Sequence, residues 1–367
     1  MQRVYEGSRA LKIFEESIKA EKTKSLYKDC LDKFLGWANK DHESILRLSS
    51  KELQILLEDY VIFLKEDKGF STISLAMYAI GKFLEMNDKE FKKSKLKRLL
   101  PERHKTAGKK AYTTEEINTM LEFADTLRNK ALIHFLCASG CRPGLITELK
   151  WKHLMEMPEN CYAITGYAGS TREYTTFLHF EARKALDLYK EENLPNNPES
   201  FVFPNLRSLK PEPMNSKAVD SVIARIIEKA KIQRIRSEGS ESRYEKALTY
   251  GFRKRFNTIL KNNPKISYAI AQRLMDHKAY LEEEYHDTSD INKFFGEYYK
   301  AIPDLIIDEE VRLTEANNAK DKTIKKLQSG NPEFIQLKNQ LEEQKERLDN
   351  YDRVFNEIMK LNNQKAR

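Results

Sequence analysis

The 367-residue chain has few of the residues that mark several protein classes. Its four cysteines, Cys30, Cys137, Cys141 and Cys161, are too sparse for a disulfide framework and include no CxxC pair. Because Cys137 and Cys141 lie four residues apart on one helix face, we expect buried core thiols there, with a metal site as the alternative. We expect no cofactor and no metal.

Long apolar runs are also missing. No stretch approaches the roughly 20 residues that cross a bilayer, and the first residues show no signal-peptide pattern. We therefore expect a cytoplasmic protein with no membrane partner. The 40% hydrophobic and 10% aromatic content excludes a disordered chain. The length suits two ordinary domains.

Positive charge is in excess, with a formal net charge of +8, which favours a polyanionic partner. Residues 92–110 read KKSKLKRLLPERHKTAGKK and hold nine Lys and Arg against one acid, Glu102. We expect a basic linker over 92–112 whose lysines contact phosphates. A solvated tether with the same composition is the alternative.

Hydrophobic periodicity predicts a mainly α-helical fold with a small β-sheet. Residues 1–91 have the pattern of a helical bundle, and a capping box at Thr113–Glu116 starts the next domain, 113–305. Helices are expected at 116–123, 129–138, 181–191 and 216–231, and over most of 244–305. Segments 162–165 and 174–178 alternate like strands of a hairpin or small sheet.

The tail, residues 306–367, has a different pattern. Apolar residues recur in steps of three and four from Phe334 to Ile358, with charged residues between them. This pattern resembles a coiled coil. Since such a seam needs a partner, the tail either pairs with another copy or packs on the domain 113–305 of its own chain.

Three stretches carry residues suited to phosphodiester chemistry, which needs a nucleophile and cations on the phosphate. The first ends an apolar helix at Gly140 and places Arg142 before another helix. The second, LTYGFRKRFNT, contains Arg253, and the third runs from Arg273 through His277 to Tyr285. Each alone has an ordinary structural reading, as a salt-bridging arginine, a basic helix or a packed tyrosine.

Together and in this order, the stretches resemble the tyrosine recombinases, or phage-type integrases, and most of all the archaeal integrases. The resemblance covers about residues 20–305 and includes the helical DNA-clamping domain. It implies that Arg142 and Arg253 hold the scissile phosphate, that His277 is the second-box histidine and that Tyr285 is the nucleophile. A 3′-phosphotyrosine intermediate would form without metal or nucleotide. The DNA contacts would include Lys105, Lys109, Lys110, Lys254 and Arg255.

The same resemblance implies a site-specific recombinase of a mobile element or virus. Its partners would be double-stranded attachment sites and further copies of the chain, assembled as a tetramer on paired sites. The tail could aid that assembly.

Four positions depart from the family pattern. Leu145 stands where an acid usually supports Arg142, with Glu148 as a possible substitute, and Asp276 stands where a glycine usually precedes His277. Tyr250 replaces the first histidine of the HxxR box, and Thr171 replaces the hairpin lysine, with Arg172 next to it. Arg172 can stabilise charge, but with a pKa above about 12 it is a poor proton donor.

These departures keep a second hypothesis open, namely a recombinase-derived DNA-binding or regulatory protein with weak or lost cleavage. A type IB topoisomerase-like enzyme and a helical scaffold protein are further alternatives. The helical domain and the tail argue against the former, and the ordered motifs against the latter.

Overall fold

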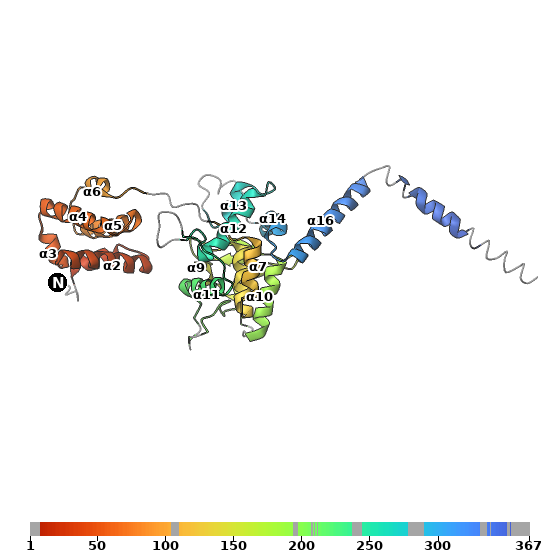
Figure 1. The fold of residues 1–367 in the computed structure, drawn as a ribbon, viewed down its shortest axis with the longest axis horizontal. Coiled ribbons are helices and arrows are strands. Elements are labelled where there is room, and N and C mark those ends of the chain that lie inside the picture. Colours follow the sequence, from red (N-terminus) through yellow and green to blue (C-terminus); the bar gives the residue numbers. More distant parts are fainter. Residues whose placement is uncertain are drawn as a thin grey trace, which may run out of the picture. The chain divides into compact units, whose positions relative to one another are not determined.

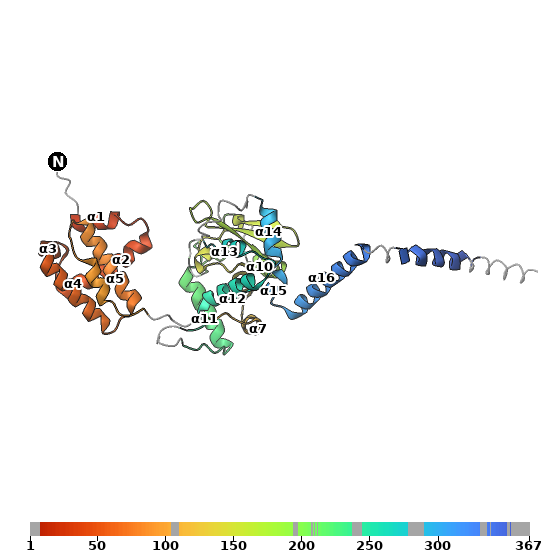
Figure 2. The same ribbon diagram turned by 90° about the horizontal axis from the view of Figure 1, so that it is seen from above.

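A computed structural model describes residues 8–103, 110–193, 197–206, 208, 210, 212–236, 244–277, 290–330, 336–337, 339–350 and 353. The chain divides into two compact units, Met1–Thr106 and Ala107–Arg367 (Figures 1 and 2). In the described ranges, no helix has both the length and the apolar content needed to cross a membrane.

The first unit is all helical in its described part. Its helices are α1 (Arg9–Glu16), α2 (Glu21–Ala38), α3 (His42–Arg47), α4 (Ser50–Lys65), α5 (Phe70–Met86) and α6 (Lys93–Leu99). Helix α5 packs against α1, α2 and α4, because its residues Ile73, Ile80 and Phe83 form an apolar stripe that is fully buried. The predicted helical bundle is therefore present.

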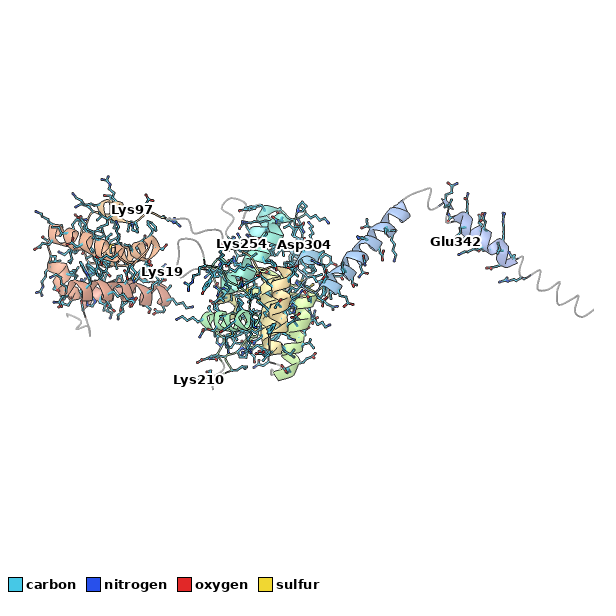
Figure 3. All side chains as sticks on the ribbon, in the orientation of Figure 1. Lys19, Lys97, Lys210, Lys254, Asp304 and Glu342 are labelled. Atoms are coloured by element: carbon cyan, nitrogen blue, oxygen red, sulfur yellow. The ribbon has the colours of Figure 1, made fainter. Side chains whose placement is uncertain are left out.

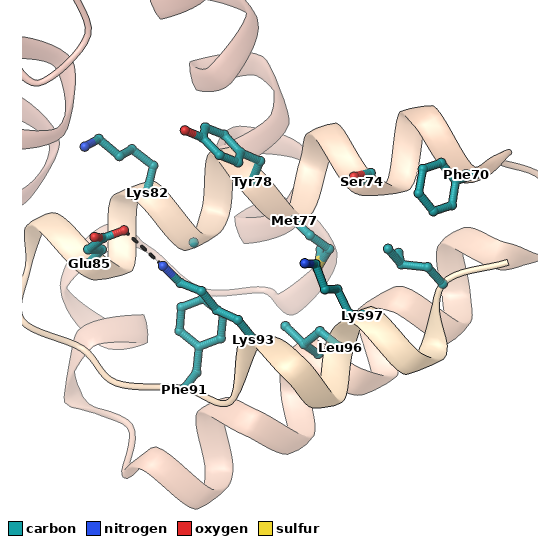
Figure 4. Close-up of a pocket in the computed structure, with 12 residues that line it drawn as sticks. Phe70, Ser74, Met77, Tyr78, Lys82, Glu85, Phe91, Lys93, Leu96 and Lys97 are labelled. Atoms are coloured by element: carbon teal, nitrogen blue, oxygen red, sulfur yellow. Dashed lines mark hydrogen bonds and ion pairs between the residues drawn. The ribbon is translucent and has the colours of Figure 1, made fainter. Parts of the chain in front are cut away.

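Helix α6 lies inside the stretch that the sequence predicts as a linker. Leu96 is 4% exposed and packs into the core of the first unit, and Leu99 packs against the same core, so residues 93–99 belong to that unit. A groove of about 630 Å³ runs along α5 and α6 (Figure 4). Lys82, Lys93 and Lys97 line it, and Lys93 pairs with Glu85 at 3.1 Å.

The second unit combines helices with one sheet. Its elements are α7 (Thr114–Glu122), α8 (Leu127–Ser139), α9 (Pro143–Ile146), the 3₁₀-helix η1 (Trp151–His153), β1 (Leu154–Met157), β2 (Cys161–Gly166), β3 (Tyr174–Leu178), α10 (Phe180–Asn193), α11 (Ser216–Lys229), α12 (Leu248–Asn262), α13 (Tyr268–Leu274), α14 (Ile291–Tyr299), α15 (Ile302–Leu305) and α16 (Glu309–Gly330). Helix α8 lies at the centre and contacts α7, α10 and α12.

The sheet is antiparallel, in the order β1-β2-β3. The two predicted strands are β2 and β3, which pair from Tyr162 with Leu178 to Gly166 with Tyr174. Strand β1, which lies at an edge of the sheet, is not predicted from the sequence. Met155 and Glu156 of that strand are exposed, so it lacks the alternating pattern that marks a half-buried strand.

Two helix ends place the site. At the start of α7, Thr113 accepts from the amide of Glu116 at 3.2 Å and Glu116 accepts from the amide of Thr113 at 3.0 Å, which confirms the predicted capping box. At the end of α8, Gly140 has a left-handed backbone with φ of 54°. A Cβ there would overlap the ring of Phe256, so the turn and the close approach of α12 both require glycine.

In the tail, helix α16 ends at Gly330, and residues 339–350 are helical. The seam residues Leu337, Leu341 and Leu348 have exposed side chains, whereas Phe334 and Phe355 lie outside the described residues. The coiled coil remains a prediction.

Candidate active site

Arg142 lies at the predicted helix junction. Helix α8 ends at Gly140, α9 begins at Pro143, and Arg142 is the N-cap residue between them. Its side chain is 28% exposed. Its Nη2 donates to the backbone oxygen of Asp276 at 3.0 Å, and its Nη1 donates to the carboxylate of the same residue. This arrangement holds the partly exposed guanidinium at the surface of the second unit.

Arg253 comes from the middle of α12 and is only 6% exposed. Its Nη1 donates to the backbone oxygen of Gly140 at 2.8 Å, and its Nη2 donates to the backbone oxygen of Met275. Among the described residues, no carboxylate pairs with it. The positive charge of Arg253 thus faces neutral acceptors and no carboxylate in the described structure, which favours an anionic ligand at this place.

His277 follows α13 and completes the group. Its Nε2 lies 3.0 Å from Nη2 of Arg253, and its Nδ1 lies 2.6 Å from Oε1 of Gln272. Since the amide oxygen of Gln272 only accepts, we assign the proton to Nδ1, which leaves Nε2 as the acceptor of the Arg253 donor. This is the neutral imidazole.

The electrostatics agree with that assignment. Burial lowers the pKa of His277 from its ordinary value, and the charges of Arg253 and Arg142 lower it further. Burial likewise lowers the pKa of Arg253, with the charge of Arg142 as the next cause. Two guanidinium groups this close together form a site that suits an anion such as phosphate.

Arg172 and Tyr250 border this group. Arg172 lies in the loop between β2 and β3, where its Nη2 is 3.6 Å from the carboxylate of Asp276 and its guanidinium lies over the ring of Tyr167 at 4.6 Å. Thr171 is exposed beside it. Tyr250 lies on α12, near one turn before Arg253, and is 48% exposed. The structure thus brings Arg172 to the site.

The predicted DNA-contacting residues have different environments. Lys254 is exposed on α12 (Figure 3), and the Nζ of Lys110 pairs with Glu245 at 2.7 Å while its side chain stays 59% exposed. Lys105 and Lys109 lie outside the described residues.

The prediction that Arg255 contacts DNA is wrong. Its side chain is 6% exposed, and it donates to the backbone oxygens of Leu305 and Asp304 and to the hydroxyl of Thr114. A guanidinium enclosed in this way ties α12 to α15 and cannot reach a phosphate. The run of three cations in the sequence hid this difference between Lys254 and Arg255.

Tyr285 lies outside the described residues, which resume at Asp290. Two other tyrosines, Tyr298 and Tyr299, lie in the described residues that follow. Tyr298 is fully buried and donates to the backbone oxygen of Ala138 at 2.9 Å. Burial raises its pKa far above the ordinary value. Tyr298 is thus a core residue, whereas Tyr299 is 38% exposed.

Sequence reasoning missed two residues of the site. Asp276 figured only as a departure from the family pattern, yet its carboxylate contacts two arginines. Gln272 orients His277, and its position five residues earlier, on the last turns of α13, was the only feature of the sequence that could have indicated this role.

Among the described residues, no cluster of three or more His, Cys, Asp and Glu side chains could hold a metal ion. Cys137 and Cys141 are buried thiols, and burial raises their pKa values to about 12 and about 11.

Comparison with known proteins gives the same class of fold. A lambda integrase fragment, solved as a dimer bound to a COC′ core site, superposes with a TM-score of 0.52 at 15% identity and covers 78% of this chain and 92% of its own. The Tn1549 transposon integrase in complex with circular intermediate DNA gives 0.52 at 14% identity, with 73% and 91% covered. A lambda integrase tetramer bound to a Holliday junction gives 0.50 at 17%, with 75% and 76% covered. No curated protein sequence matches the chain.

The second unit has a fold consistent with that of the tyrosine recombinases. Residues 110–282, which lie in the second unit, match the Phage integrase family. The chain is accordingly a site-specific DNA recombinase.

Proposed function

We propose that Tyr285 attacks a scissile phosphate held by Arg142 and Arg253, with His277 beside it. The observation that carries this proposal is the convergence of three side chains from distant parts of the sequence. Arg253 contacts Gly140, which lies 113 residues away in the turn beside Arg142, and it also contacts His277. Tyr285 follows His277 by eight positions in the sequence. A nucleophile there would reach a phosphate bound at the same place.

The two arginines suit the transition state of this reaction. An attacked phosphodiester gains negative charge on its non-bridging oxygens, and fixed guanidinium donors stabilise that charge without reorganising. Each Arg is held by backbone oxygens that do not titrate, so the cations stay in place at any ordinary pH.

These roles account for the bonds and protons of the DNA cleavage step. The Tyr285 oxygen forms a bond to phosphorus, its proton passes to Nε2 of the neutral His277 imidazole in place of the hydrogen bond from Arg253, and the bond from phosphorus to the 5′-oxygen breaks. The products are a 3′-phosphotyrosine and a strand end whose 5′-oxygen takes a proton from water to become a 5′-hydroxyl. Attack by the 5′-hydroxyl of a partner strand reverses these changes and restores the backbone, with no metal or nucleotide consumed.

The wider function is proposed from the resemblance and the comparisons. The helical first unit and exposed lysines such as Lys110 and Lys254 would hold double-stranded DNA through its phosphates. Because solved relatives include a tetramer on a Holliday junction, we propose assembly of four copies on paired attachment sites. The tail would support that assembly, and the element served would be mobile or viral, with archaeal integrases as the nearest type.

The test is formation of a covalent adduct. A duplex selected from a random pool for binding, and then nicked so that the cleaved strand diffuses away, should trap the full-length protein as an SDS-stable adduct. Tyr285→Phe should abolish the adduct, whereas Tyr280→Phe, the other tyrosine of the same stretch, should keep it. Binding without any adduct would favour the regulatory protein instead, the reading that Thr171 and Tyr250 support.

A further inference from the structure

The carboxylate of Asp276 lies between two arginines of the site. It accepts from Nη1 of Arg142 and lies 3.6 Å from Nη2 of Arg172, while the backbone oxygen of the same residue accepts from Nη2 of Arg142 at 3.0 Å. The Asp276 side chain is 17% exposed. Arg142 and Asp276 are 134 residues apart in the sequence, so this contact joins the α8–α9 turn to the turn after α13.

Among the described residues, no acid closer to Arg142 in the sequence pairs with its guanidinium. Leu145, at the position of the usual supporting acid, is 1% exposed, and its Cδ1 packs at Gly166 of β2. Glu148 is exposed, and among the described residues Asp276 is the one acid that pairs with Arg142. The negative charge that the family places on the Arg142 turn thus comes here from the opposite side of the site.

The backbone conformation of Asp276 indicates that its side chain has a role in the site. Its φ is 51°, in the left-handed region that glycine adopts most easily. For other residues this conformation costs on the order of 1 kcal/mol, and aspartate tolerates it better than most. Glycine would fit this turn without strain, but it would leave Arg142 without a carboxylate.

The contact also leaves Arg142 able to bind DNA. A guanidinium has five N–H donors, of which two are used on Asp276. The remaining donors are enough for two oxygens of one phosphate. The carboxylate can therefore stay in place while the phosphate is bound, in the way that supporting groups orient ligands elsewhere.

We propose that Asp276 is a positioning residue of the recombination reaction. It fixes the guanidinium of Arg142 for the scissile phosphate and draws Arg172 from the β2–β3 loop to the same place. One departure from the family pattern, Leu145, is thereby compensated by another, Asp276. This inference rests on the proposed function, because it assigns Asp276 a part in the same cleavage step.

The test compares single-turnover adduct formation at saturating DNA. Asp276→Asn keeps the size and the backbone oxygen but removes the charge, and we expect a rate about 10-fold to 100-fold lower with DNA affinity changed less than about 2-fold. Asp276→Glu should recover part of the rate. The matched control is Glu148→Gln, which should keep the wild-type rate because that acid does not pair with Arg142.

Either of two results would overturn the proposal. An unchanged rate in Asp276→Asn would show that the carboxylate positions nothing. A faster rate or tighter DNA binding would show that it competes with the phosphate and restrains the enzyme instead.

A folding measurement separates this inference from the proposed function. Urea midpoints of Arg142→Gln, Asp276→Asn and the double variant should be non-additive, since each partner loses the same contact. Additive midpoints would mean that the contact does not form, whatever the activity. If wild type forms no adduct, the proposed function fails, and the positioning role fails with it even where the midpoints show coupling.

Discussion

Nη2 of Arg253 and Nε2 of His277 lie 3.0 Å apart, although 24 residues separate them in the sequence. The contact requires a lone pair on Nε2, and hence an uncharged imidazole. A neutral histidine beside two guanidinium groups can take up a proton during catalysis, which a histidine already protonated cannot do.

This relationship predicts where His277 titrates. Burial and the charges of Arg253 and Arg142 all lower its pKa, so it should protonate below the ordinary value of 6.5. An NMR titration of the imidazole should show this, and Arg253→Gln should move the pKa upward because one cation is removed. Adduct formation should consequently not decline through His277 protonation between pH 8 and 6.5. A pKa above 6.5 would contradict the neutral assignment.

A second histidine governs stability in acid. His179 is fully buried, neither ring nitrogen has a hydrogen-bond partner in the described structure, and burial lowers its pKa to about 3. Because the unfolded chain binds the proton near 6.5, the free energy of unfolding should fall as the pH drops below 6.5. The linkage amounts to about 2 kcal/mol by pH 5.

The control for this effect is His179→Leu. It removes the titrating group without stranding a partner, so the slope of unfolding free energy between pH 7 and pH 5 should decrease by that amount in urea denaturation. An identical slope in wild type and variant would show that His179 is not the group responsible.

Gly140 is predicted to be irreplaceable. Gly140→Ala adds a Cβ that overlaps Phe256 and places a side chain at a φ of 54°, so we expect a loss of about 2–4 kcal/mol in urea unfolding. The comparison variant is Gly296→Ala in α14, where a Cβ meets nothing within 4 Å and helix propensity should make it neutral or slightly stabilising. Equal stability of the two variants would contradict the close approach of α12 to this turn.

The β2–β3 loop offers a gain-of-function prediction. Thr171 is exposed, so lysine fits there, and its ammonium can protonate the leaving 5′-oxygen, which Arg172 does poorly. Thr171→Lys should raise the cleavage rate about 10-fold or more. Thr171→Arg adds the same charge without a transferable proton and should give a much smaller gain. Equal gains in both variants would mean that charge, and not proton donation, limits the step.

The sequence predicted the features that local chemistry determines. The capping box at Thr113 and the glycine that ends α8 each leave a mark within a few residues. Arg142, Arg253 and His277 could be assigned because the order of their motifs resembles that of a family, and the structure brings all three together. Strands β2 and β3 were visible from alternation.

Other features depend on contacts that no local pattern records. The pairing of Asp276 with Arg142 joins residues 134 positions apart, so the sequence marked this acid only as a departure from the family pattern. Arg255 could not be told from Lys254 within a basic run, because its burial depends on carbonyl groups of α15. In α6, the charged residues concealed the single buried leucine, Leu96, that attaches this helix to the first unit.

Tyr285 is predicted to become attached to DNA through a 3′-phosphate. The most direct measurement is mass spectrometry of the adduct after digestion with protease and nuclease, which identifies the peptide that carries the nucleotide. We expect the nucleotide on Tyr285, linked through its 3′-phosphate, with a free 5′-hydroxyl on the released strand. A nucleotide on Tyr299 or any other residue, or a 5′-phosphate linkage, would contradict the account.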